Sequence, residues 1–174
     1  EPLRPYITRV MHNWVDLKKV LPEGLKKIGD NAFARCSSLD SISFPGTLET
    51  LYPGSLRGTP YWENLPGGEN YLGSVFCFKE TELDPWSPFH VDVRPGTLGI
   101  MEWQSSQYDT TMSLPDGLRY IGPDAFPDGM YELVDFTLPE SVTYIDHEAG
   151  VPISAVRDLP DALTYIGDKA FSGH

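Results

Sequence analysis

LPEGLKKIGDNAF, at residues 21–33, returns almost unchanged as LPDGLRYIGPDAF at residues 114–126 and as LPDALTYIGDKAF at residues 159–171. Weaker copies are FPGTLETLYPGSL at residues 44–56 and LPESVTYIDHEAG at residues 138–150. Their common pattern is Leu-Pro-x-x-Leu-x-x-Ile-Gly-x-x-Ala-Phe. A chain that repeats one pattern at such short range is typically a solenoid, in which each copy packs on the next.

The proline of each copy gives the length of the repeat. Successive prolines lie 20 to 24 residues apart, except for one interval of 50 residues between Pro45 and Pro95. A degraded sixth copy, RPGTLGIM, begins at Pro95. Leucine-rich repeats have periods of about 20–29 residues. A unit of this size cannot bury its own apolar face, so the sequence predicts a leucine-rich-repeat solenoid that depends on contacts between neighbouring repeats.

Two short strands are expected in each repeat. The first covers Leu39–Phe44 and its counterpart Leu133–Leu138, which are rich in β-branched or aromatic residues. The second covers Leu25–Ile28 and its equivalents, and a glycine such as Gly29 turns the chain after it. The Asp-Asn-Ala-Phe segment that follows is too short for more than a helical turn. The expected fold is therefore a stack of short parallel strands joined by turns.

The run IGDNAFARCSSL at residues 28–39 carries an Ile-Gly-x-x-Ala-Phe-x-x-Cys-x-x-Leu signature. It resembles the BspA-type leucine-rich repeats of bacterial surface proteins and of some parasitic protists. The stretch TPYWENLPGGENYLGSVFCFK at residues 59–79 resembles an insertion that recurs in that family and forms a hairpin. The resemblance covers roughly residues 10–174 and implies an extracellular or cell-surface location.

One domain is expected over residues 1–174, which is long enough to bury a continuous core. Within it, residues 1–20 are the remnant of a preceding repeat, 21–58 are repeats, 59–93 are an aromatic-rich insertion, and 94–174 are repeats again. Because the pattern stops in mid-repeat after Phe171, we expect further sequence beyond residue 174, or the end of a second chain, to cover that edge.

The net charge of −12 and the pI near 4.6 argue against nucleic acid or an anionic membrane surface as the partner. No stretch approaches the length of about 18 apolar residues that a membrane-spanning helix needs. The four histidines lie in no recognisable nucleophile motif, and no glycine-rich phosphate loop is present. The sequence therefore indicates neither an enzyme nor a bound cofactor.

Two smaller features are assigned structural roles. Cys36 and Cys77 are expected to be buried thiols, with a disulfide or a metal pair as the alternative. Asp146, His147 and Glu148 form the only local cluster of polar groups. Neighbouring residues of an extended segment point to opposite faces, so a solvated polar turn is expected there rather than a site.

A column of tyrosines is the first candidate binding surface. Tyr120, Tyr144 and Tyr165 each fall five residues after the repeat proline. Stacked repeats would place them side by side, about 4.8 Å apart, on an outer face. Such a column can receive a sugar ring or an apolar side chain, or it can simply stabilise neighbouring strands. Lys27 and Thr50 take this position in earlier repeats, so a platform would be confined to the C-terminal half.

Two further surfaces are candidates. The outward residues of the other predicted strand offer a broad face for a macromolecule, or are merely solvated; they are Ser41, Ser43, Asp135 and Thr137. In the insertion, most aromatic side chains are expected to pack onto the solenoid. Trp62 and Trp86 would anchor a partner if they were exposed.

The function expected from the resemblance is that of a non-enzymatic, secreted or surface-exposed interaction protein. Its partner would be a protein ligand, such as a host extracellular or surface protein, which it adheres to or recognises. Two alternatives remain: a glycan-binding module, and a structural spacer of a larger surface protein.

Overall fold

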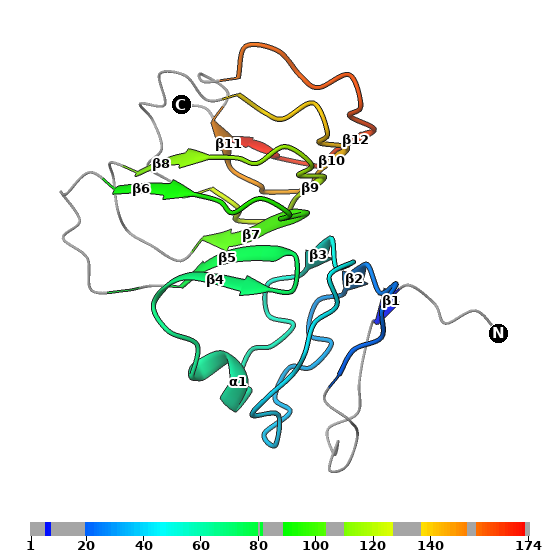
Figure 1. The fold of residues 1–174 in the computed structure, drawn as a ribbon, viewed down its shortest axis with the longest axis vertical. Helices are drawn as coiled ribbons and strands as arrows, with labels where there is room; N and C mark the ends of the chain where they lie inside the picture. Colours follow the sequence, from blue (N-terminus) through cyan, green and yellow to red (C-terminus); the bar gives the residue numbers. More distant parts are fainter. Residues whose placement is uncertain are drawn as a thin grey trace.

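The chain folds into a β-solenoid of about five turns with parallel strands and almost no helix. This computed structural model describes residues 6–7, 20–79, 81, 89–103, 110–126, 137–152 and 156–172. Figure 1 shows the coils stacked from the N-terminal repeats at the lower right to the C-terminal repeats at the top. The prediction of a leucine-rich-repeat solenoid is confirmed.

The strands are short because each contributes only one edge of a coil. The described elements are β1 (Tyr6–Ile7), β2 (Lys27–Ile28), β3 (Thr50–Leu51), α1 (Pro60–Glu63), β4 (Gly68–Leu72), β5 (Val75–Lys79), β6 (Phe89–Asp92), β7 (Gly99–Trp103), β8 (Thr110–Ser113), β9 (Tyr120–Ile121), β10 (Tyr144–Ile145), β11 (Val151–Pro152), β12 (Tyr165–Ile166) and β13 (Phe171–Ser172).

The strands form two main sheets and two small ones. The N-terminal sheet has the order β1-β2-β3 and is parallel. The larger sheet has the order β12-β10-β9-β7-β5-β4, and only its β4–β5 hairpin is antiparallel. The pairs β6–β8 and β11–β13 are parallel. Equivalent residues of successive repeats lie directly opposite one another, so the repeat in sequence becomes a column in space.

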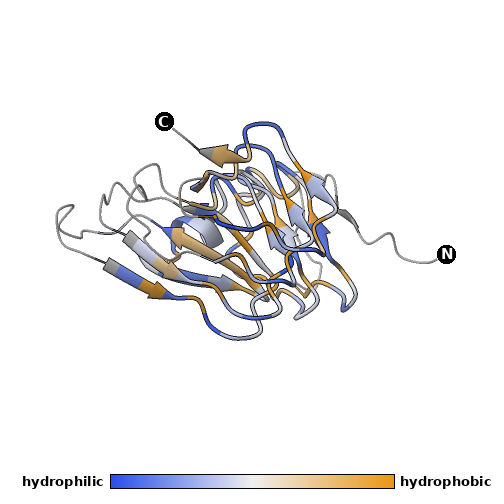
Figure 2. Ribbon diagram, turned by 90° about the horizontal axis from the view of Figure 1, so that it is seen from above, coloured by the Kyte–Doolittle hydropathy of each residue, from blue (hydrophilic) through white to orange (hydrophobic). Residues whose placement is uncertain are grey.

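The inward positions of the repeat pattern form the core. Leu25, Ile28 and Phe33 are at most 3% exposed, and their equivalents Leu118, Ile121 and Phe126 are equally buried. These residues belong to two hydrophobic clusters, one mainly of the N-terminal repeats and one mainly of the C-terminal repeats, and the insertion contributes to both. Seen from above in Figure 2, the hydrophobic segments lie inside the coil and the hydrophilic ones lie mainly on its outer turns.

The two main sheets meet at Gly99, the first residue of β7. A Cβ atom built on Gly99 would lie 1.9 Å from the carbonyl oxygen of Glu49, which directly precedes β3. No side chain fits in that space, so the backbone of the N-terminal sheet lies directly against β7. This contact places β2 and β3 within reach of β9 and β10.

The strand predicted over Leu39–Phe44 is reduced to a single bridge, between Val20 and Ser43. The prediction of a longer strand is wrong, and at its first residue the backbone is bonded to the insertion instead. The N–H of Tyr61, in α1, donates a hydrogen bond to the carbonyl oxygen of Leu39 at 2.8 Å. Residues 133–136 of the equivalent predicted strand lie outside the described residues.

The hairpin of β4 and β5 lies in the stretch expected to form one, and β5 joins the large sheet through β7. Phe76 and Phe78 are 1% exposed, and Tyr61, Trp62 and Tyr71 pack against the core clusters. For these residues the prediction that insertion aromatics pack onto the solenoid is confirmed. Trp86 and the side chain of Phe89 lie outside the described residues.

Cys36 and Cys77 are buried, free thiols, as predicted. Burial raises the pKa of Cys77 to about 12, with the charge of Glu102 adding to the effect, and burial raises the pKa of Cys36 as well. At pH 8 about one Cys77 thiol in ten thousand would be a thiolate. We therefore expect iodoacetamide to leave the folded protein unmodified and to alkylate both cysteines in urea, as mass spectrometry would show. Stoichiometric alkylation without denaturant would contradict this.

Candidate functional site

The predicted tyrosine column is present on β9, β10 and β12. Tyr144 pairs in register with Tyr120 on one side and with Tyr165 on the other. The ring centroids of Tyr120 and Tyr144 are 4.8 Å apart, and those of Tyr144 and Tyr165 are 4.3 Å apart. The planes are inclined by only 10° and 14°, so the rings stack face to face. The prediction that these tyrosines lie side by side is confirmed.

The column is not uniformly on an outer face, as the spacing had suggested. Tyr120 is 2% exposed, whereas Tyr165 is 44% exposed and Tyr144 is intermediate. The difference arises because the N-terminal sheet packs over Tyr120, through the contact of β3 with β7. Both faces of the Tyr144 ring are covered by its neighbours, whereas Tyr165 is stacked on one face only, so the column presents ring edges and the outer face of Tyr165.

A buried carboxylate lies beneath the column. The side chain of Asp146 is inside the protein, with the residue 3% exposed. The hydroxyl of Tyr52 donates a hydrogen bond to its Oδ2 at 2.7 Å, and the hydroxyl of Tyr120 donates another to the same oxygen. The backbone N–H of His147 donates to Oδ1 at 2.8 Å, and Nδ1 of the same histidine lies 2.7 Å from it.

This arrangement corrects the expectation of a solvated polar turn at Asp146, His147 and Glu148. His147 and Glu148 are exposed, but Asp146 points inward and is paired. An alignment of the copies would have marked Asp146 as exceptional, because it stands where other copies have Gly29, Gly122 or Gly167. A buried acidic side chain at a position otherwise held by glycine needs a hydrogen-bond donor, and here the hydroxyl of Tyr52, which follows β3 of the other sheet, is one.

The Asp146 cluster has unusual ionisation properties. Burial alone would raise the pKa of Asp146, but hydrogen bonds from Tyr120, His147 and Tyr52 outweigh it, and the pKa is lowered. The pKa of Tyr120 is raised by burial and by its hydrogen bond to Asp146, and that of Tyr144 is raised by burial and by the charge of Asp146. The cluster therefore holds one negative charge under neutral phenols.

Lys27 supplies a positive charge to the column from the N-terminal sheet. Its Nζ lies 4.8 Å from the ring centroid of Tyr120 and 4.6 Å from that of Tyr144. In a flat sheet with strands about 4.8 Å apart, the strands between β2 and β9 would put these residues out of reach. Its contact with both rings is thus a consequence of the close packing of the N-terminal sheet against β7 at Gly99.

We expect Lys27→Met to lower the free energy of unfolding by about 1 kcal/mol, because it removes a cation from two aromatic rings and keeps the length of the side chain. Urea titration would measure the loss. Lys26→Met is the matched control: Lys26 forms an ion pair with Glu49 at 2.9 Å but is half exposed, and such surface pairs contribute about 0.5 kcal/mol or less. An equal loss in both variants would contradict the role given to Lys27.

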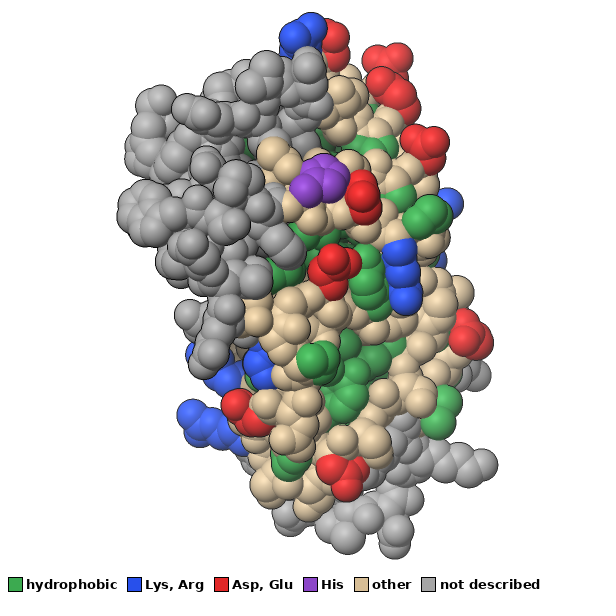
Figure 3. Space-filling model, turned by 60° about the vertical axis from the view of Figure 1, so that its left-hand side comes forward, with side chains coloured by type: hydrophobic (Ala, Val, Ile, Leu, Met, Phe, Trp, Pro, Cys, Tyr) green, Lys and Arg blue, Asp and Glu red, His purple; other side chains and the backbone are tan. Residues whose placement is uncertain are grey.

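The other predicted surface residues are dispersed. Ser41, Ser43 and Thr137 are exposed, as outward residues should be. Asp135 and Trp86 lie outside the described residues. Trp62 is intermediate in exposure and lines a small pocket with Arg57 and Glu102. On the face shown in Figure 3, several acidic side chains lie near the upper right and hydrophobic ones gather in the lower half.

A cluster of His90, Asp92 and Ser113 was not expected from the sequence. Ser113 Oγ lies 3.1 Å and Asp92 Oδ1 lies 3.2 Å from the same nitrogen, Nε2 of His90. In a catalytic triad the carboxylate must bind the opposite ring nitrogen, and here Nδ1 contacts Thr111 Oγ1 at 2.6 Å instead. The side chain of Asp92 is 82% exposed. The cluster therefore lacks the geometry that activates a serine.

Across the described ranges, no group of three or more His, Cys, Asp or Glu side chains is placed to hold a metal ion. Within the same part of the chain, no helix has the length and apolar character needed to cross a bilayer.

Comparison with known proteins identifies the repeat. A family model described as the BspA type leucine rich repeat region matches in six copies, over residues 10–83 and 99–174. No curated protein and no solved structure matched the chain. Proteins of this family are generally surface-associated and generally not enzymes. The chain belongs to the BspA-type leucine-rich repeat family.

Proposed function

We propose that this chain is the recognition part of a surface protein and binds a protein ligand through the tyrosine face, which we define as Lys27, Tyr144 and Tyr165. Leucine-rich-repeat domains generally mediate protein–protein interactions. The observation that carries the choice of surface is the stacked column, whose exposure rises from Tyr120 to Tyr165. A host extracellular or surface protein is the ligand class to which the family resemblance points.

The tyrosine face has the properties of an interaction surface. Tyrosine is enriched among the residues that dominate binding energy, because its ring is large and has few rotatable bonds. Stacking between Tyr144 and Tyr165 fixes both rings before a partner arrives, which reduces the entropy lost on binding. Lys27 adds a cation beside the rings, in a chain whose net charge is −12.

The stacking speaks against the column as a sugar platform. A pyranose ring rests on an open aromatic face, and stacking within the column leaves only the outer face of Tyr165 for it. A glycan-binding role through the column is therefore less well supported than protein recognition. The purely structural spacer remains the alternative if no surface of the chain binds anything.

The test is a binding screen of the purified chain against a panel of immobilised extracellular-matrix proteins. Tyr120 must be kept, because it is buried and anchors Asp146. We expect the double variant Tyr144→Ser, Tyr165→Ser to lose at least about tenfold in affinity for whichever protein binds. Circular dichroism and thermal melting would establish that the variant is folded.

A second variant examines the other predicted surface. Ser41→Lys with Ser43→Lys places two charges on the strand face without touching the tyrosines. Loss of binding in this variant alone would move the ligand to the strand face. If the unmodified chain binds no protein in the panel, the spacer function becomes the better description.

A further inference from the structure

Lys27 is a cation of the tyrosine face that has no anionic partner. Its Nζ is almost equally close to two rings, at 4.8 Å from the centroid of Tyr120 and 4.6 Å from that of Tyr144. Apart from these rings, the ammonium forms no ion pair and no hydrogen bond in the part of the chain that the structure describes. Lys27 is intermediate in exposure. The rings therefore hold the ammonium in place, and its donors remain for solvent or for a ligand.

The cations next to Lys27 are paired. Lys26 and Arg119 approach the same oxygen of Glu49, at 2.9 Å and 3.6 Å. They stand directly before residues of the column position, Lys26 before Lys27 and Arg119 before Tyr120. Three positive charges thus border the column, with one carboxylate between two of them. In a chain whose net charge is −12, a local excess of positive charge attracts an anionic partner that most of the surface would repel.

The buried carboxylate of Asp146 does not cancel this excess. Its Oδ2 accepts hydrogen bonds from the hydroxyls of Tyr52 and Tyr120, and its Oδ1 accepts one from the backbone N–H of His147. The residue is 3% exposed, so a ligand does not reach it. Even if its charge is counted in full together with that of Glu49, the three cations leave one positive charge in excess.

The exposed rings favour the same kind of partner. Both faces of the Tyr144 ring and one face of the Tyr165 ring are covered by stacking, so a ligand that lies along the column meets ring edges. The edge of an aromatic ring carries the positive part of its quadrupole, and it is attracted to an anion or to the face of another ring. Lys27 and the ring edges beside it therefore suit a carboxylate and a nearby aromatic side chain.

The spacing along the column sets the distance between these two ligand groups. Lys27 lies beside the ring of Tyr144, and the ring of Tyr165 lies one strand further, 4.3 Å from it. In an extended peptide, residues i and i+2 point to the same face and are about 7 Å apart. A carboxylate at residue i can thus reach Lys27 while an aromatic ring at residue i+2 packs against the edges of the two tyrosines.

We propose that the tyrosine face recognises an extended segment of its protein ligand in which an acidic residue and an aromatic residue are two positions apart. The acidic residue pairs with Lys27, and the aromatic ring packs face-on against the edges of Tyr144 and Tyr165. A peptide is favoured over a sulfated sugar because stacking leaves Tyr144 without an open face for a pyranose. This inference rests on the protein recognition proposed for the tyrosine face and names the chemistry of the ligand.

The test is an NMR titration of the full chain with acetyl-Ala-Glu-Ala-Phe-Ala-amide and with the matched peptide in which glutamine replaces glutamate. The glutamate peptide is expected to bind about fivefold more tightly at low salt, because only it forms the ion pair with Lys27. The difference should shrink in about 0.5 M sodium chloride, which screens the pair. A third peptide, with alanine in place of phenylalanine, should bind about fivefold more weakly than the first.

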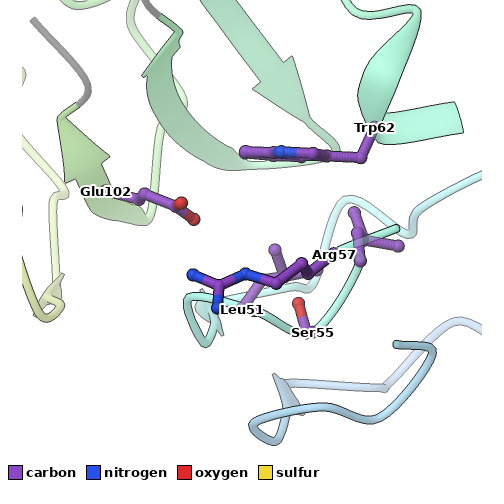
Figure 4. Close-up of a pocket in the computed structure, with 7 residues that line it drawn as sticks. Leu51, Ser55, Arg57, Trp62 and Glu102 are labelled. Atoms are coloured by element: carbon purple, nitrogen blue, oxygen red, sulfur yellow. The ribbon is translucent and has the colours of Figure 1, made fainter. Parts of the chain in front are cut away.

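Lys27→Met should bind the glutamate and glutamine peptides equally. Arg57→Gln is the matched control, because it also removes one positive charge, at a small pocket that no residue of the tyrosine face lines. Figure 4 shows Arg57 across this pocket from the indole of Trp62, with the carboxylate of Glu102 facing its guanidinium. The control should keep the fivefold preference for glutamate. Circular dichroism would establish that both variants are folded.

The inference is overturned by equal affinity for the glutamate and glutamine peptides, by a preference that survives Lys27→Met, or by no binding of any peptide. If the two peptides bind equally and Tyr144→Ser, Tyr165→Ser loses both, the face still recognises protein and only its selection of an acid is wrong. If that double variant binds the peptides as tightly as the parent, the proposed function of the face fails too. Tighter binding of a heparin disaccharide than of the glutamate peptide would assign Lys27 to sulfated glycans instead.

Discussion

Asp146→Ala should lower the free energy of unfolding by about 3 kcal/mol, since it removes the charged acceptor of two tyrosine hydroxyls. Tyr120 is fully buried and its hydroxyl would be left without a partner, and Tyr52 would lose its 2.7 Å hydrogen bond. Chemical denaturation monitored by circular dichroism would measure the loss. Asp116→Ala is the control, because Asp116 is exposed in a turn of the preceding repeat, where substitutions change stability by about 0.5 kcal/mol or less.

The same carboxylate predicts a pH dependence. Because the folded-state pKa of Asp146 is lowered, the folded state binds its proton less tightly than the unfolded chain. The stability that it contributes is present above the unfolded-state pKa of about 4, and it is lost as the pH falls through the folded-state value. The parent protein should thus lose more stability than Asp146→Ala between pH 7 and pH 3. Parallel curves for the two proteins would refute the role of Asp146.

Gly99→Ala should be the most damaging glycine substitution, with a loss of about 3 kcal/mol or more or a failure to fold. The added methyl would lie 1.9 Å from the carbonyl oxygen of Glu49, and neither backbone can move without parting the two sheets. At Gly122 the nearest atom, a carbonyl oxygen of Ile100, would be 3.0 Å away, so the loss should be smaller.

Gly46→Ala gives the baseline for this series, because a Cβ atom there has nothing within 4 Å and the residue does not have positive φ. From most to least stable, the expected order is Gly46→Ala, Gly122→Ala, Gly99→Ala. Equal melting temperatures for Gly46→Ala and Gly99→Ala would show that β3 and β7 are not in contact in solution.

The repeat pattern was enough to predict the solenoid, its core positions and the tyrosine column. Each of these follows from periodicity: residues at the same place in successive copies must lie in one column. For this reason the spacing of Tyr120, Tyr144 and Tyr165 gave their register correctly. The same reasoning placed Leu25, Ile28 and Phe33 in the core.

The features that break the repeat could not be predicted from it. The contact of Gly99 with Glu49 follows the 50-residue interval, and periodicity carries no information there about which strands approach. The burial of Tyr120 and the pairing of Tyr52 with Asp146 both depend on that contact between the two sheets. Aligning the copies does reveal that Asp146 replaces glycine. Only the structure reveals what surrounds this side chain.

The contact between Tyr52 and Asp146 joins residues that are 94 positions apart in the chain. In an ordinary solenoid each repeat touches only its neighbours, so repeats can unfold one after another and can be duplicated or deleted without consequence for distant ones. Here Lys27 contacts the rings of Tyr120 and Tyr144, in β9 and β10, and Tyr52 is bonded to Asp146, although these residues belong to coils that are not neighbours in sequence. The chain should therefore unfold as one cooperative unit. Inserting or deleting a repeat between residues 27 and 146 should break these contacts, whereas a change in repeat number outside that span should leave them intact.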